Sequence, residues 1–123
     1  MHVERRRKRS NFAGLALQYY LASVARRTRV VSLVVADSAG LLVASSMKGP
    51  EADELAAIAP LLMRSDEEGS CPVDRHKLPL VIEKVPVDRS SLFVCAVGIQ
   101  QRCADSVKQA KSGVRRILEA QAA

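Results

Sequence analysis

The sequence lacks residues on which several functional classes depend. It contains no tryptophan, and aromatic residues make up only 3% of its 123 positions. Single-stranded nucleic-acid modules stack bases on aromatic side chains, so this class is disfavoured. A core must instead be built from valine, leucine, isoleucine and alanine. That is feasible in one domain of this length, because 48% of the residues are hydrophobic.

Cysteines are few and scattered. Cys71, Cys95 and Cys103 form no C-x-x-C motif and cannot build a disulfide framework or a zinc site. Cys95 lies in an apolar run and is predicted to be a small buried hydrophobe. The odd count fits a reducing compartment, and the apolar stretch at residues 11–27 is interrupted by polar residues. We therefore expect a cytoplasmic protein without a transmembrane segment.

Enzyme motifs are missing too. His2 and His76 have no nucleophile at an informative spacing, and there is no glycine-rich phosphate loop, H-E-x-x-H or G-x-S-x-G. Neighbouring carboxylates such as Asp53 and Glu54 fall at the start of a predicted helix, where solvation accounts for them. We expect a protein that is not an enzyme, with no catalytic residue, bound cofactor or metal site.

Positive charge is concentrated near the N-terminus. The formal net charge is +6, and the run "ERRRKR" at Glu4–Arg9 contributes +4 of it. The favoured interpretation is a flexible, solvated basic arm over residues 1–10. The alternative is nonspecific nucleic-acid binding through this arm. Specific recognition is not expected, because no helix-turn-helix pattern is present.

The stretch "RVVSLVVADSAGLLVASS" predicts a hairpin that is apolar on both faces. The first strand would place Val31, Leu33 and Val35 on one face and Val30, Val34 and Ala36 on the other. "DSAG" supplies the turn. Since both faces are apolar, both must be covered.

Three helical patterns can supply that cover. The first helix is predicted to start at about Phe12, capped by Ser10 or Asn11. The second begins at Pro50, with a kink or break expected just before Pro60. The third is the amphipathic C-terminal segment, in which Gly113 is a candidate for close packing.

The order of elements indicates an α+β fold. A helix, a hairpin, a second helix, a three-strand meander ("CPVDR", "LPLVIEKVPVD" and "SLFVCAVGI") and a last helix predict a five-stranded antiparallel sheet. The first and last helices would pair on one face and the middle helix would lie on the other. One short helix cannot cover a sheet face, so an apolar patch that binds a partner is expected beside it.

This ordered set resembles the Roadblock, or dynein light-chain roadblock, domain family, in its bacterial stand-alone form. The carriers are "VVSLVVADSAGLLVASS", "ADELAAIAPLL", "SSLFVCAVG" and "ADSVKQAKSGVRRIL". The resemblance implies a single domain at residues 11–123 with a profilin-like architecture, one helix on one sheet face and two on the other.

The resemblance also implies a homodimer, in which third strands pair edge to edge and middle helices lie side by side. The third strand here would be Ser70–Lys77, where Pro72 departs from the pattern because it lacks an N–H. The predicted dimer contacts are Ala52, Ala56, Ala59 and Val73.

Roadblock proteins regulate or scaffold small Ras-like GTPases, or serve as adaptor subunits of other complexes. The resemblance therefore implies a non-catalytic dimeric regulator that binds such a GTPase, with modulation of GTP hydrolysis as one outcome, or a related signalling partner. The alternative is an adaptor without GTPase contact. The predicted partner-binding residues are Leu55, Leu62, Met63 and Arg64. The competing interpretation is that Leu55 and Leu62 face the sheet.

Overall fold

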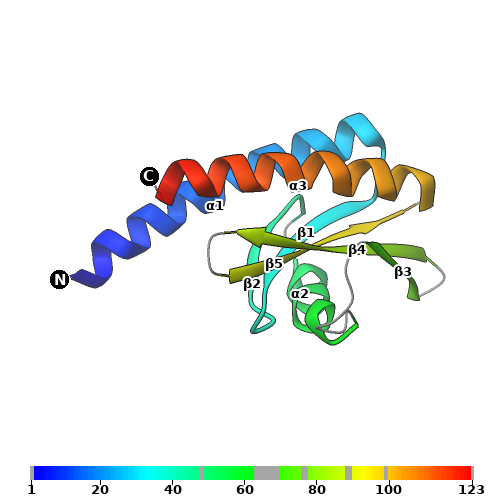
Figure 1. Ribbon diagram of the computed structural model, residues 1–123, viewed down its shortest axis with the longest axis horizontal. Helices are drawn as coiled ribbons and strands as arrows, with labels where there is room; N and C mark the ends of the chain where they lie inside the picture. The colour runs from blue at the N-terminus through cyan, green and yellow to red at the C-terminus, as the bar shows by residue number, and fades with distance from the viewer. Residues whose placement is uncertain are drawn as a thin grey trace.

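The computed structural model describes residues 2–47, 49–62, 70–75, 78–87, 90–98 and 100–122, and side chains within 14–47, 49–61, 80–87, 91–98 and 101–120. Along the chain its elements are α1 (His2–Thr28), β1 (Ser32–Asp37), β2 (Leu42–Ser45), α2 (Pro50–Leu62), β3 (Ser70–Arg75), β4 (Leu78–Val87), β5 (Ser90–Val97) and α3 (Gln100–Ala122) (Figure 1). The predicted α+β class is confirmed.

The strands form one antiparallel sheet in the order β2-β1-β5-β4-β3. Strands β3, β4 and β5 make the meander, and β1 joins it by pairing with β5. The hairpin partner β2 and the short strand β3 therefore lie at the two edges. The most apolar strands, β1 and β5, lie inside the sheet, as expected for strands buried on both faces.

Helices lie on both faces of the sheet. Figure 1 shows α1 and α3 side by side above it and the shorter α2 below it. Leu33 and Val35 are buried in the cluster under α1 and α3, whereas Val34 and Ala36 are buried in the cluster under α2. The two-faced hairpin is confirmed for these four residues.

The start of the hairpin differs from the prediction. Val30 is buried with Leu33 and Val35, whereas Val31 is 54% exposed. Strand β1 begins only at Ser32, and Arg29 takes a positive φ of 57°. This left-handed residue reverses the chain between helix and strand, so the alternation of the strand does not extend back to Val30 and Val31.

Helix α1 begins at His2, so the predicted start at Phe12 and the caps at Ser10 or Asn11 are wrong. Arginine, lysine and glutamate are good helix formers, and the basic run therefore continues the helix. Figure 1 shows the N-terminal turns extending past the end of the sheet. The flexibility of residues 1–10 stays a prediction.

Helix α2 continues through Pro60 to Leu62, and the predicted break before Pro60 is absent. A proline in a helix removes the hydrogen bond to the carbonyl four residues earlier. Here that residue is Ala56, and only two helical residues follow Pro60, so the lost bond lies near the end of the helix.

At Gly113, helix α3 lies against a side chain of α1. A Cβ at Gly113 would overlap the ring of Tyr20, whose hydroxyl donates a hydrogen bond to the carbonyl oxygen of Gln109 at 2.7 Å. The Arg116 guanidinium lies 5.9 Å from the centre of the same ring. The predicted role of Gly113 in close packing is confirmed.

Candidate interaction surface on the α2 side of the sheet

The alanine stripe of α2 faces the protein's own sheet. Ala52 is 6% exposed, and Ala56 and Ala59 are fully buried, in a cluster with Val34 and Ile82. Small side chains let the helix lie close to the strands. In the single chain the sheet already covers these alanines, and the dimer contact predicted for them stays a prediction.

The outward side of α2 carries a large exposed apolar residue, Leu61, whose exposed fraction is 80%. The sequence interpretation missed it, although its position gives the signal. Leu61 follows the buried Ala59 by two residues, and two residues rotate a helix by about 200°. Leu55 is partly buried and packs against the α2 cluster, which agrees with the competing interpretation for this residue.

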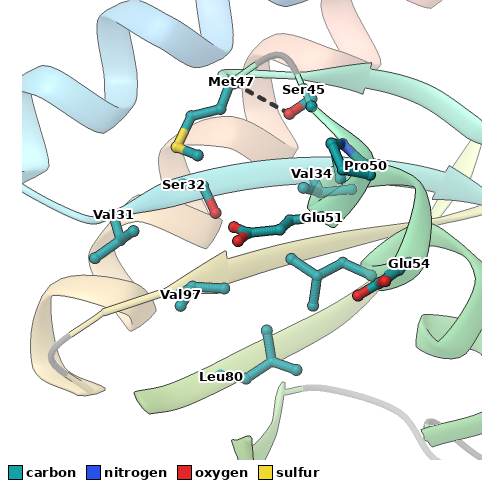
Figure 2. A pocket seen from close by; sticks show the side chains of 13 residues that line it. Val31, Ser32, Val34, Ser45, Met47, Pro50, Glu51, Glu54, Leu80 and Val97 are labelled. Carbon is teal, nitrogen blue, oxygen red and sulfur yellow. Dashed lines mark hydrogen bonds between the residues drawn. The ribbon is translucent and has the colours of Figure 1, made fainter. Parts of the chain in front are cut away.

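A pocket of about 500 Å³ opens beside the first turns of α2 (Figure 2). It lies at one end of the sheet, where Ser32 of β1 pairs with Val97 of β5 and Val97 pairs with Leu80 of β4. The lining residues come from these strands, the end of β2 and the start of α2: Val31, Ser32, Val34, Ser45, Met47, Gly49, Pro50, Glu51, Ala52, Glu54, Leu55, Leu80 and Val97. This pocket is the uncovered apolar area expected beside a short helix.

Polar groups in the pocket are few. The Ser45 hydroxyl accepts a hydrogen bond from the Met47 N–H at 3.1 Å. Ser32 is only 7% exposed. Figure 2 shows its hydroxyl and the Glu51 carboxylate directed into the same space. Glu51 lies in the first turn of α2, where negative charge complements the helix dipole.

The remaining predicted contacts lie partly outside the described residues. Leu62 ends α2, but its side chain is outside that set, as are Met63 and Arg64. Val73 lies in β3 opposite Leu80 of β4, and its side chain is also outside. The partner-binding roles of Leu62, Met63 and Arg64 stay predictions.

The two described thiols are inert. Cys95 is 1% exposed, and burial raises its pKa to about 12. Burial also raises the pKa of Cys103. Both are therefore protonated at neutral pH, and the expectation that Cys95 acts as a small buried hydrophobe is confirmed.

Neither a metal cluster nor a membrane span occurs among the described residues. Within those ranges, no three histidine, cysteine or acidic side chains gather closely enough to hold a metal ion. No described helix combines the length and hydrophobicity needed to cross a bilayer.

Solved structures share this architecture. No protein-family model and no curated protein matches the sequence. MglB of Myxococcus xanthus superposes with a TM-score of 0.64 at 12% identity, covering 87% of this chain and 90% of that one. The gliding protein MglB of Thermus thermophilus gives a TM-score of 0.65 at 16% identity, covering 88% and 92%.

A third similar structure is named as a member of the family that the sequence resembles. The Roadblock/LC7 domain from Streptomyces avermitilis gives a TM-score of 0.65 at 18% identity, over 83% of this chain and 97% of that one. At these identities the likeness establishes the fold. The chain therefore has the fold of a bacterial Roadblock-type domain.

Proposed function

We propose that this protein is a non-catalytic, dimeric regulator or scaffold that binds a small Ras-like GTPase through the α2 side of its sheet. The observation that carries the proposal is the unequal covering of the sheet: two helices protect one face, and one short helix leaves a pocket and the exposed Leu61 on the other. The shared Roadblock fold supplies the class of partner.

The α2 side combines a pocket with exposed apolar side chains. Helices α1 and α3 pack against each other over the opposite face, where Leu15 and Tyr19 of α1 are also exposed. On the α2 side, Leu61 is 80% exposed and Val31 is 54% exposed. A pocket with mainly apolar walls, such as the one that Val31 lines, is a common place for a partner to bind. Leu55 of α2 and the residues that follow Leu61, namely Leu62, Met63 and Arg64, complete the proposed contact.

The dimer is proposed to form at the free edge of the sheet. β3 is the last strand in the sheet order and pairs on one side with β4. A proline is tolerated in an edge strand where its missing N–H faces away from the ladder. Pro72 would then remove one donor from the outer edge, so two copies would pair in a register that places no acceptor opposite it. Val73 and the outward side of α2 would flank that seam.

Light scattering tests this proposal. The chain is measured alone, and then mixed with each small Ras-like GTPase of its own organism loaded with GDP or with a non-hydrolysable GTP analogue. We expect twice the chain mass of 13.4 kDa alone and a further increase with one GTPase. A monomer that binds none of them in either nucleotide state contradicts the proposal.

The dependence of binding on salt distinguishes GTPase binding from the alternative, nucleic-acid binding through Glu4–Arg9. Binding through phosphate contacts by the five basic residues of this run weakens steeply between about 50 and 200 mM salt, by about 500-fold. A GTPase complex formed through an apolar surface should keep most of its affinity over that range. An adaptor of another kind would show the dimer mass and no GTPase binding.

A further inference from the structure

The pocket beside α2 contains a buried polar group that has no partner among the described residues. Ser32 is 7% exposed, and within the part of the chain that the structure describes its hydroxyl makes no hydrogen bond. A hydroxyl without a protein partner can donate and accept hydrogen bonds with a group that enters the pocket. The other buried serine of the pocket, Ser45, accepts a bond from Met47. Ser32 therefore has unused bonding capacity at the floor of the pocket, directed into it (Figure 2).

The walls around Ser32 are apolar. They are formed mainly by valine and leucine side chains from the strands, from α2 and from the residue before β1: Val31, Val34, Leu55, Leu80 and Val97. The volume of about 500 Å³ falls within the range of pockets that hold ligands. There is thus room for more than one side chain of a partner.

Among the described residues that line the pocket, the charged side chains are both acidic, Glu51 and Glu54, although the whole chain has a net charge of +6. Glu51 lies in the first turn of α2, a place that the helix dipole alone explains, and Glu54 follows that turn. The dipole does not explain Ser32, which lies across the pocket in β1. Together they make a site with an apolar body, a hydroxyl at the floor and negative charge at the rim, which disfavours an anion.

We propose that this pocket takes a lysine or arginine side chain, next to an apolar side chain, from the bound GTPase. The inference rests on the proposed function. The cationic head donates hydrogen bonds to the Glu51 carboxylate and the Ser32 hydroxyl, while its aliphatic stem and the apolar neighbour lie against Leu80 and Val97. A charge-assisted bond of this type stabilises a complex about twice as much as a neutral one.

The pocket can be tested without the GTPase. Backbone amide NMR spectra are recorded while n-butylguanidinium, n-butanol or butyrate is added at constant ionic strength. We expect saturable shifts at Ser32, Glu51 and Val97 with n-butylguanidinium, at least fivefold weaker binding of n-butanol and none of butyrate. Equal binding of the alcohol, binding of butyrate, or shifts that never saturate would overturn the inference.

Variants identify the groups responsible. Glu51→Gln keeps the shape and removes the charge, and we expect about tenfold weaker binding of n-butylguanidinium. Asp53→Asn is the matched control, since Asp53 is also exposed in the first turn of α2 but does not line the pocket. We expect less than a twofold change. Ser32→Ala should weaken binding about fivefold, the equivalent of one neutral hydrogen bond. Equal effects of the Glu51 and Asp53 variants would count against the pocket.

The GTPase complex then separates the two proposals. Glu51→Gln should weaken that complex about tenfold, and Asp53→Asn should leave it unchanged within twofold. A GTPase that binds both variants as tightly as the wild type refutes the use of the pocket and leaves the proposed function standing. Saturable binding of n-butylguanidinium with no GTPase binding at all supports the cation preference of the pocket and refutes the proposed function.

Discussion

Replacing Gly113 by alanine should destabilise this protein, although the same change stabilises most helices. Glycine inside a helix costs about 1 kcal/mol relative to alanine. Here an added Cβ would overlap ring atoms of Tyr20 and lie 2.6 Å from its hydroxyl oxygen. The ring would have to leave its place between α1 and α3. Whether the substitution raises or lowers the free energy of unfolding therefore depends on Tyr20.

The structure allows a rough magnitude. Displacing Tyr20 forfeits its 2.7 Å hydrogen bond to Gln109, which contributes about 1 kcal/mol. It also forfeits the contact with Arg116, about 0.5 kcal/mol, and part of the ring's burial, about 1 kcal/mol. The gain in helix propensity offsets about 1 kcal/mol. Gly113→Ala should thus lower the free energy of unfolding by about 1.5 kcal/mol.

A double-mutant cycle measured by urea unfolding, followed by circular dichroism, tests this reasoning. In a Tyr20→Ala background the space is open, so Gly113→Ala should stabilise by about 1 kcal/mol, which reverses its sign. Ser112→Ala, at the exposed neighbouring position, controls for propensity and should stabilise in both backgrounds. If Gly113→Ala stabilises the wild type as much as the Tyr20→Ala variant, the packing argument is refuted.

Two further predictions concern stability. Burial raises the pKa of Cys95 from 9.0 to about 12, so the neutral thiol contributes fully to the free energy of unfolding below pH 9, and this contribution is lost by about 1.4 kcal/mol per pH unit as the pH rises from 9 to 12. Between about pH 8 and 10 the free energy of unfolding should therefore fall less for Cys95→Ala than for the wild type. Equal slopes in urea titrations would contradict this. The Asp37 carboxylate accepts hydrogen bonds from the N–H groups of Ala39 and Leu41, both at 2.9 Å. Asp37→Ala should therefore lower the free energy of unfolding by about 1–2 kcal/mol, and Asp37→Asn, which keeps an acceptor, by less than half as much. Equal losses of stability in thermal unfolding would disprove the turn's dependence on this oxygen.

Apolar alternation made most of the fold predictable. The hairpin has apolar side chains on both faces, Leu33 and Val35 on one and Val34 and Ala36 on the other, so both faces must be covered. The three predicted helices supply that cover. Periodicity did not reveal the sharp turn at Arg29, because a positive φ at a non-glycine residue depends on how helix and strand must be connected. The helix start was misplaced because a run of arginines reads as solvated and also has high helix propensity.

The candidate surface was predictable in outline only. The short middle helix indicated that the sheet would be incompletely covered, and the pocket lies where that argument places it. The sequence does not decide which side of α2 faces the sheet, because alanine suits both a close helix–sheet contact and a close helix–helix contact. The burial of Ala56 and Ala59 resolves this, and the exposed Leu61 follows from it. The lack of a partner for Ser32 among the described residues could not be foreseen, since pairing is a property of the folded structure.

The affinity of the GTPase for two surface variants tests the central claim most directly. Leu61→Glu places a charge on the outward side of α2, and Tyr19→Glu places one at a 73% exposed position of α1, in the opposite layer. Both sites are exposed, so both variants should unfold within a few degrees of the wild type. We predict that Leu61→Glu weakens binding at least tenfold and Tyr19→Glu less than twofold, by titration calorimetry. Equal losses, or a greater loss for Tyr19→Glu, would contradict partner binding on the α2 side.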